Sequence, residues 1–480
     1  MKYAHSKLEF IPPKYNVFVL KIFHLLLPIF LRFRLRPWLV AGITNIKVIN
    51  AEILVELYEQ FQKGKIRLII AFRHPEIDDP LCLTYLLSRV VPKVAREKKI
   101  KLKYPIHSYF IYDRGMTIWG GNWLGWLFSK GGGIPIHRGK PLDRKALKTA
   151  RDLLINGKFP LMIAPEGGNN LHSDIVSKLQ LGVAQLGVWC VEDLFKENRT
   201  EEVLIVPINI QYKYIKNNWY KLDNLLCKLE KDSGLEIKII KEYSNLEKIK
   251  NLFYERLLIL SDKILTSMEN FYSCFYHVNI SQVNILEIKN CEIEMILSEE
   301  NKYLANNVIL RLDNLLHIAL EVTEEYFKIK KKGSLIDRCR RLEEASWGYI
   351  YREDIKDFKN ISSLDKNLAE WIANEAQLRV KHMRLVENFV AMTADYIREK
   401  PTFDRFTETS LILFDVMAKI KGEKIPKRPR LGKRITTLTI GKTISVKEYF
   451  NNENLSKRKR KQAVNNITYQ LQKTLEKNQN

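Results

Sequence analysis

Cysteine is scarce in this sequence, and its spacing excludes cysteine-based metal and redox motifs. No two cysteines among the 480 residues stand at the spacing of a zinc ligand set or a redox pair. We expect Cys82 and Cys190, which have apolar neighbours, to be ordinary core residues. Nothing in this usage indicates an oxidising compartment. The cysteines are Cys82, Cys190, Cys227, Cys274, Cys291 and Cys339.

The apolar run near the start of the chain is short for a membrane span. Val17–Leu31 is apolar except for Lys21, His24 and Pro28, and it falls below the roughly 20 residues that a span requires. It ends in the basic segment Arg32–Trp38, whereas a cleavable signal peptide ends in small residues. We therefore expect a helix that lies in, or dips into, a bilayer surface. A buried core helix, or a true span with its arginines on the cytoplasmic side, is the alternative.

Acidic residues are too few to balance the basic ones. Lys and Arg number 79 against 55 Asp and Glu, which gives a net charge of +24. This excess favours anionic partners such as nucleic acid, anionic lipid or an acidic carrier protein. The basic run Lys457–Lys461 lies in one tail, without interleaved aromatic residues, and no nucleic-acid-binding motif is present. A solvated tail is its default interpretation, and a nucleic-acid-binding protein stays an alternative.

The most informative stretch is an apolar run that stops at a histidine. Ile66–Phe72 has the length and composition of a buried strand, and His74 follows it. Five residues later Asp79 precedes Pro80, which predicts Asp79 as an N-cap with proline at the first helical position. At a strand–loop–helix junction the two side chains can meet. A carboxylate that orients an imidazole makes the histidine a general base.

Two other interpretations of this stretch are open. The acidic residues beside the histidine can form a solvated loop, or they can bind a divalent ion in a metal-dependent hydrolase. A metal site formed by His74, Glu76, Asp78 and Asp79 needs further ligands from elsewhere. The candidates by proximity in sequence are His107, His137 and His172.

Three further blocks follow in order along the chain. Gly131–Lys140 places basic residues after a glycine-rich turn and a short apolar segment. Phe159–Gly168 is a second buried strand that ends in Pro-Glu-Gly-Gly. Val203–Ile210 is a third strand, with an internal proline that suits an edge or a bulge. Each block is weak alone, and their order and spacing carry the signal.

In this order the blocks resemble the glycerol-phosphate and lysophosphatidate (1-acylglycerol-3-phosphate) acyltransferase family. The family's His-x4-Asp motif corresponds to His74 and Asp79, with Arg73 where the family commonly has Asn. Its second motif corresponds to Gly133–Arg138. The third, Pro-Glu-Gly, corresponds to Pro165, Glu166 and Gly167, and the fourth to Val206-Pro207-Ile208.

The resemblance covers roughly residues 60 to 215, under half of the chain, and it departs from the family at one place. Gly168-Asn169-Asn170 replaces the Thr-Arg-Ser that usually ends the third motif, so an arginine expected near the acceptor phosphate is missing. Phosphate contact then falls to Arg138, with Lys140 helping, because the planar fork of arginine can bind two phosphate oxygens.

The resemblance implies a fold and a reaction. The fold is α/β, a central mixed sheet with flanking helices, followed by a mainly α-helical C-terminal section. The reaction moves a fatty acyl group from a thioester to a glycerophosphate-type hydroxyl, foremost 1-acylglycerol-3-phosphate, in phospholipid synthesis. His74 and Asp79 are its catalytic residues, and Glu166 and Gly167 shape the acceptor pocket beside Arg138 and Lys140. It needs no metal or resident cofactor, and acyl carrier protein or coenzyme A carries the acyl group.

Composition and pattern divide the chain into four sections. Residues 1–58 are a membrane-associating segment, 59–230 an acyltransferase α/β domain, 240–425 a helical section, and 426–480 a basic linker with short strands and a C-terminal helix. We expect the section 59–230 to contain strands near 66–72, 106–112, 160–164 and 203–212. A closing strand near 436–446 resembles one that returns to the sheet in such acyltransferases, which makes the helical section an insertion.

One apolar stripe marks the helical section. Trp371, Leu378, Leu385, Phe389, Met392 and Tyr396 recur at helical spacing, which predicts core or a helix–helix seam. With no export signal apparent, we expect the protein to associate with the cytoplasmic face of a membrane, as a peripheral or monotopic protein. Its expected partners are membrane lipids and the acyl donor, without nucleic acid.

Overall fold

The computed structural model describes residues 3–36, 39–137, 143–237, 245–280, 299–352, 354–355, 358, 360–389, 395–423, 426–449 and 456–477. They form two compact units, each described by itself. The α/β unit contains Glu9–His137, Pro141–Lys213 and Lys433–Asn480, and the helical unit contains Met1–Leu8 and Tyr214–Gly432. The predicted fold class, a mixed central sheet with flanking helices plus a helical C-terminal section, is confirmed.

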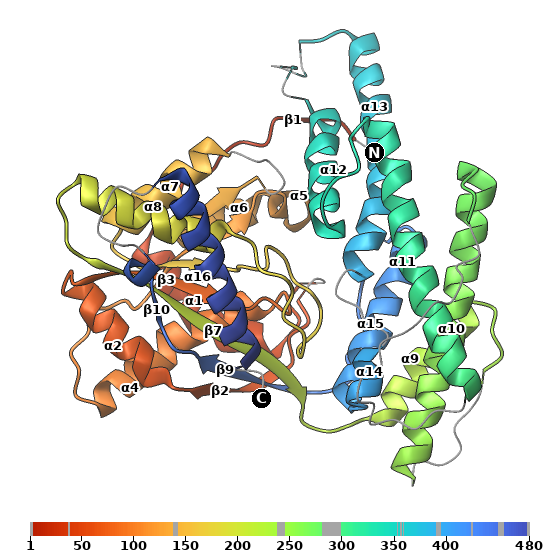
Figure 1. The fold of residues 1–480 in the computed structure, drawn as a ribbon, viewed down its shortest axis with the longest axis horizontal. Helices are drawn as coiled ribbons and strands as arrows, with labels where there is room; N and C mark the ends of the chain where they lie inside the picture. Colours follow the sequence, from red (N-terminus) through yellow and green to blue (C-terminus); the bar gives the residue numbers. More distant parts are fainter. Residues whose placement is uncertain are drawn as a thin grey trace. The chain divides into compact units, whose positions relative to one another are not determined.

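A mixed sheet forms the centre of the α/β unit (Figure 1). Its strand order is β2-β9-β7-β3-β6-β4-β5, and β10 pairs with β7. Strand β3 is parallel to both of its neighbours, and β10 runs antiparallel to β7. The strands are β2 Ile43–Ile49, β3 Ile66–Phe72, β4 Tyr109–Asp113, β5 Gly133–Ile136, β6 Leu161–Ile163, β7 Glu202–Tyr214, β9 Arg434–Ile440 and β10 Ile444–Ser445.

Strand β3 is buried along its whole length because helices cover both faces of the sheet. Its side chains alternate between two cores: Leu68 and Ile70 belong to one, and Ile69 and Ala71 to the other. A nearly continuous apolar run, interrupted here by the buried Arg67, is typical of a parallel strand covered on both sides. The predicted strands near 66–72, 160–164 and 203–212 correspond to β3, β6 and β7, and β4 begins later than the predicted 106.

Two helical layers flank this sheet. One core packs α1, α2, α3 and α4 against it, and the other packs α7, α8 and α16 against the opposite face. The helices are α1 Val17–Arg32, α2 Ala51–Gln62, α3 Asp79–Tyr85, α4 Val91–Glu97, α5 Met116–Gly120, α6 Asn122–Lys130, α7 Arg144–Asn156, α8 Gly182–Lys196 and α16 Lys457–Lys477, with a π-helical turn at Leu86–Val90 and a 3-10 turn at Lys447–Tyr449.

Helix α1 coincides with the apolar run near the start of the chain. The side chain of Asn16 caps it by accepting hydrogen bonds from the backbone N–H groups of Phe18 and Val19, at 3.0 and 3.1 Å. Leu27 and Leu31 are buried in the core of the α/β unit. The opposite side of the helix leaves large apolar side chains exposed: Phe18, Ile22, Leu25 and Ile29. Within the described residues, no helix is both long and apolar enough to cross a membrane.

The chain returns to the sheet after the helical unit. Strand β9 pairs in parallel with β2 and lies between β2 and β7, and β10 pairs with β7. The expected return of the last strands is therefore confirmed. The four predicted sections remain a description of the sequence, because the α/β unit begins before residue 58 and includes α1, β2 and α2.

The helical unit is built from long helices that pack side by side (Figure 1). Helix α11 contacts α10, α12 and α13, and α15 contacts α9, α10 and α13. The elements are α9 Trp219–Asp232, α10 Leu246–Tyr276, α11 Glu299–Phe327, α12 Leu335–Ile350, α13 Ser363–Phe389, α14 Asp395–Glu399 and α15 Phe403–Ile420, with the short parallel pair β1 His5–Ser6 and β8 Tyr351–Arg352.

The stripe predicted for this unit is only partly buried. Trp371 is 67% exposed and Leu378 is 42% exposed, so the prediction of core or seam is wrong for these two residues. Phe389 packs against the core, and Tyr396 is buried on α14. Met392 lies outside the described residues. Helical spacing identifies a common face, but it does not tell which part of that face another element covers.

Candidate active site

The junction between β3 and α3 brings His74 and Asp79 together. Helix α3 begins at Asp79, with Asp78 at the N-cap and Pro80 in the first turn, so the predicted start is one residue late. Asp79 Oδ2 accepts a hydrogen bond from His74 Nδ1 at 2.8 Å. The Asp79 carboxylate is fully buried, whereas the imidazole is 22% exposed. This geometry places the proton on Nδ1 and leaves the lone pair on Nε2.

Two further donors fix the Asp79 carboxylate. The hydroxyl of Tyr212, on β7, donates to Oδ1 at 2.5 Å, and the backbone N–H of Glu76 donates to Oδ2 at 2.9 Å. Burial raises the pKa of Asp79, and the hydrogen bonds from His74 and Tyr212 oppose that rise. Burial also raises the pKa of Tyr212 well above its ordinary value, so its hydroxyl stays a donor at neutral pH. Sequence reasoning missed Tyr212, which was expected only as the end of a strand.

Arg434 anchors the loop between His74 and Asp79 from the far end of the chain. It is the first residue of β9 and it is buried. Its guanidinium donates to Glu76 Oε2 at 2.5 Å and to Asp78 Oδ2 at 3.0 Å. The same group lies over the ring of Tyr212, with 4.8 Å between Cζ and the ring centroid. No local sequence signal identifies this contact, because it depends on β9 joining the sheet.

Asp78 is the second buried carboxylate of the loop. Its Oδ2 also accepts a hydrogen bond from the backbone N–H of Ala41 at 2.7 Å. Burial raises the pKa of Asp78 to about 6, and the nearby positive charge of Arg434 acts in the opposite direction. Asp78 thus fastens the loop to β9 and to the segment before β2, while Asp79 faces the histidine.

Glu166 and Arg73 hold the backbone around His74. Glu166 is buried, and its Oε1 accepts a hydrogen bond from the backbone N–H of His74 at 2.9 Å. Its Oε2 accepts from Asn170 Nδ2 at 3.1 Å and from the backbone N–H of Ser177 at 2.9 Å. Burial raises the pKa of Glu166, and the charge of Arg73 opposes this. These contacts show Glu166 as a support for the histidine; its predicted contact with the acceptor stays a prediction.

Arg73 stands where the resembling family commonly has Asn, and its role here is structural. Its guanidinium is fully buried and donates to backbone carbonyls of Ser173, His172 and Ile175. It therefore fastens the segment that follows Glu166 to the end of β3. Gly167 lies in that segment at a φ of +73°, in the left-handed region that favours glycine.

The predicted phosphate ligands follow another strand of the same sheet. Arg138 and Lys140 lie outside the described residues, so their predicted role stays a prediction. The residue before them, His137, comes directly after β5, and its backbone N–H donates to Asp143 Oδ2 at 2.9 Å. Because β3, β6, β4 and β5 are consecutive parallel neighbours, their carboxyl ends meet at one edge of the sheet. His74, Glu166 and His137 all follow strands at this edge.

The acidic residues near His74 are arranged around an arginine. Within the described residues, no group of three or more His, Cys, Asp or Glu side chains is placed to hold a metal ion. Glu76 and Asp78 face the guanidinium of Arg434 instead. His107, another candidate ligand, uses Nε2 for a 2.7 Å hydrogen bond with the carbonyl of Gly131, and burial lowers its pKa to about 4.

Comparison with known proteins identifies the domain that carries this site. The model of the Acyltransferase family matches residues 45–211, which run from β2 into β7 and include His74, Asp79 and Glu166. Tyr212 and Arg434 lie outside the matched range. No curated protein matches the chain. The chain thus contains an acyltransferase domain, and the predicted resemblance is confirmed for this domain.

Proposed function

We propose that this protein transfers a fatty acyl group from a thioester to the hydroxyl of a glycerophosphate-type lipid, with 1-acylglycerol-3-phosphate as the first acceptor to test. The acyltransferase domain supports acyl transfer in lipid synthesis at the level of the family. The observation that supports the proposal most directly is the hydrogen bond between His74 and a buried, triply held Asp79.

In the proposed reaction, His74 is a general base. Its Nε2 takes the proton from the acceptor hydroxyl while that oxygen attacks the carbonyl carbon of the thioester. The proton moves during the attack because a free alcohol is far less acidic than an imidazolium. Asp79 keeps the ring in one tautomer and stabilises the positive charge that develops on it. Such assistance accelerates a reaction by about 10²–10⁴-fold.

The tetrahedral intermediate then collapses. Its carbon–sulfur bond breaks, the new ester leaves with the acyl group, and the proton on His74 passes to the departing thiolate. The reaction balances as alcohol plus thioester giving ester plus thiol, so it needs no metal and no resident cofactor. Acyl carrier protein or coenzyme A serves as the thiol carrier, and a net charge of +24 favours the acidic carrier protein.

Arg138, assisted by Lys140, is the proposed ligand of the acceptor phosphate, with Glu166 and Gly167 beside it. The support comes from the order of the strands, because the end of β5, which Arg138 follows closely in the sequence, and the end of β3 belong to the same edge of the sheet. A guanidinium can bind two phosphate oxygens at once. A lipid phosphate held there presents its neighbouring hydroxyl to His74.

Peripheral attachment to the cytoplasmic face of a membrane completes the proposal. Four exposed side chains on one side of α1, of which Phe18 is 72% exposed, form an apolar stripe at helical spacing. Helix α6 adds two exposed tryptophans, Trp123 and Trp126, and Arg36 lies 4.7 Å from the centroid of the Trp123 ring. Burial of the four α1 side chains contributes about 6–12 kcal/mol gross.

The test is a panel of radiolabelled acyl donors and lysolipid acceptors offered to the purified protein, with products identified by mass. The proposal expects an ester product with acyl-carrier or coenzyme A thioesters and 1-acylglycerol-3-phosphate. A parallel assay with a chelator distinguishes acyl transfer from the alternative of a metal-dependent hydrolase, which would lose its activity when the metal is removed. Release of free fatty acid without any ester product from the whole panel would contradict the proposal.

A further inference from the structure

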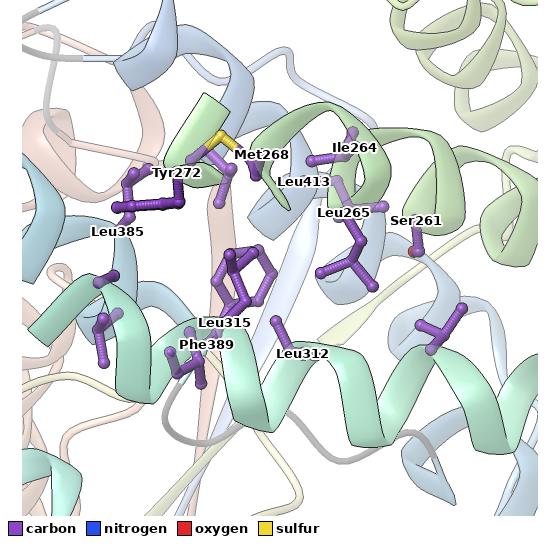
Figure 2. Close-up of a pocket in the computed structure, with 15 residues that line it drawn as sticks. Ser261, Ile264, Leu265, Met268, Tyr272, Leu312, Leu315, Leu385, Phe389 and Leu413 are labelled. Atoms are coloured by element: carbon purple, nitrogen blue, oxygen red, sulfur yellow. The ribbon is translucent and has the colours of Figure 1, made fainter. Parts of the chain in front are cut away.

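The helical unit contains an apolar pocket that acyl transfer at His74 does not use. The pocket has a volume of about 60 Å³, whereas a single water requires roughly 10–15 Å³ measured in the same way. Helices α10, α11, α13 and α15 line it, and Figure 2 shows side chains of α10 and α11 around it. Among the described residues that line it, Ser261 and Tyr272 are the polar ones. Such a surface favours a hydrocarbon over water.

The pocket is lined by both buried and partly exposed residues. Leu265, Leu315 and Ala319 are buried, whereas Ser261, Ile264, Met268, Leu312 and Leu385 are only partly buried. An apolar pocket that combines a buried wall with partly exposed side chains can admit the end of a flexible chain. A fully enclosed packing defect would have only buried walls.

A chain of polar groups leads from this pocket to an arginine. The hydroxyl of Tyr272, which lines the pocket, is hydrogen-bonded to His382 Nδ1 at 2.8 Å. His382 Nε2 is hydrogen-bonded to the hydroxyl of Tyr276 at 2.9 Å. Arg379 donates from Nη1 to that same hydroxyl at 3.0 Å. Burial lowers the pKa of His382 to about 4, so the ring is neutral and adds no charge between the two tyrosines at pH 7.

Arg379 has the features of a side chain that binds an anion. Its guanidinium lies against the rings of Tyr276 and Tyr326, at 5.4 and 5.2 Å from their centroids. Its Nε is buried and, in the part of the chain that the structure describes, has no hydrogen-bond acceptor. No described carboxylate forms an ion pair with it. A half-buried, aromatic-flanked guanidinium without an acidic partner favours an anion from outside.

The two features lie on one face of α13. Arg379, His382, Leu385 and Phe389 are separated by three, three and four residues, so they lie on one face of the helix, within about 120° of one another. At 1.5 Å per residue, Arg379 and Phe389 are about 15 Å apart along the axis. An anionic head at one end and an apolar pocket at the other match the two ends of a fatty acid.

We infer that the helical unit binds a single fatty acid, with the terminal methylenes of its tail in the pocket and its carboxylate at Arg379. The choice of a fatty acyl chain rests on the acyltransferase domain of the same protein, because domains of this family act on acyl groups. The site itself lies within the helical unit and contains none of the proposed catalytic residues. It therefore gives this unit a ligand of its own.

The test measures binding without turnover. Full-length protein is titrated with a fluorescent fatty acid, which laurate, myristate and palmitate then displace. Each methylene that enters the pocket is expected to increase affinity by about fourfold, up to the chain length that fills it. A diazirine-bearing palmitate, activated by light and mapped by mass spectrometry, then identifies the labelled peptides. Labelling is expected in residues 261–272, 308–319 or 385–389.

Variants connect the binding to the two ends of the site. Ala319→Leu fills the pocket, and Ser261→Phe fills it from its partly exposed side in case the first variant fails to fold; both are expected to weaken binding at least tenfold. Arg379→Gln is expected to weaken it about 10- to 100-fold, and Arg379→Lys to restore part of the affinity. Lys381→Gln removes a charge from the exposed side of α13 and is expected to have no effect.

Two results would overturn the inference. One is labelling confined to the α/β unit, which would assign all fatty-acid binding to that unit. The other is wild-type affinity in folded Ala319→Leu and Ser261→Phe variants. Because the readout is binding, failure of acyl transfer in the donor and acceptor panel leaves this result standing, and failure here leaves the proposed transfer standing.

Discussion

Replacement of Arg434 by methionine tests whether the far end of the chain holds the proposed catalytic loop. The substitution keeps a long side chain but removes the hydrogen bonds to Glu76, Asp78 and the carbonyl of Ala41. It also removes the cation from the face of the Tyr212 ring. Loss of one partner of a buried ion pair costs about 3–5 kcal/mol, because the other charge stays buried without compensation.

The expected outcome has a thermodynamic and a kinetic part. Urea unfolding of Arg434→Met should show a loss of about 3–5 kcal/mol, a large share of the 5–15 kcal/mol typical of folded proteins. With the loop loosened, kcat should fall at least tenfold while KM changes less. Addition of Asp78→Asn should recover at least about 1 kcal/mol, since it removes the uncompensated carboxylate.

A surface ion pair in the same unit provides the matched control. Arg460 pairs with Glu192 and is 40% exposed, so Arg460→Met should cost less than about 1 kcal/mol and leave kcat unchanged. The reasoning is refuted if Arg434→Met loses no more stability than this control, or if its turnover equals that of the wild type.

Three further perturbations probe the site and its surroundings. Tyr212→Phe removes a hydrogen bond of about 1.5–3 kcal/mol to the Asp79 carboxylate, so kcat should fall about tenfold or more in a steady-state assay. Asp78→Asn should flatten the pH dependence of stability. Burial raises the pKa of Asp78 from 3.8 to about 6, so the protonated carboxyl stabilises the folded state fully below pH 3.8. This contribution is lost as the pH rises through about 6. The difference between wild type and variant in urea unfolding should reach about 3 kcal/mol across this window. The double variant Phe18→Ser/Leu25→Ser should lower partitioning onto anionic vesicles by about a hundredfold or more in a sedimentation assay.

Each of these has a result that counts against it. Unchanged kcat in Tyr212→Phe would show that Asp79 needs no third donor. Parallel stability profiles of wild type and Asp78→Asn between pH 4 and 7 would show that this carboxyl does not titrate in that range. For the vesicle assay, Phe195→Ser is the control, because Phe195 on α8 is 74% exposed and lies outside α1. Equal losses in the control and the double variant would contradict attachment through α1.

The local part of the site could be predicted from the sequence. Six of the seven residues of Ile66–Phe72 are apolar, as is typical of a central strand, the exception being Arg67, and Pro80 marks the first turn of α3. These signals span few residues, so the local pattern alone is enough to place His74 and Asp79 at one junction. The loop closes through a contact between residues five apart, which needs no knowledge of distant elements.

The distant part could not be predicted. Tyr212 and Arg434 reach Asp79 and Asp78 over 133 and 356 residues, through strands whose neighbours no local pattern specifies. Strand β2 was missed for another reason: it contains Thr44, Asn45 and Lys47 and lies at the edge of the sheet, so it lacks the apolar run of β3. Trp371 shows a similar limit for a helix. The spacing of the apolar residues identified one face of α13, but it did not tell whether another element covers that face at Trp371.

The central claim is that His74 takes the proton from the acceptor hydroxyl. The measurement that tests it most directly is the single-turnover rate of acyl transfer by purified His74→Ala, compared with wild type under saturating donor and acceptor. Loss of a general base should lower this rate by about 10²–10⁴-fold while the protein stays folded and bound to vesicles. A rate within a few-fold of wild type would contradict the claim.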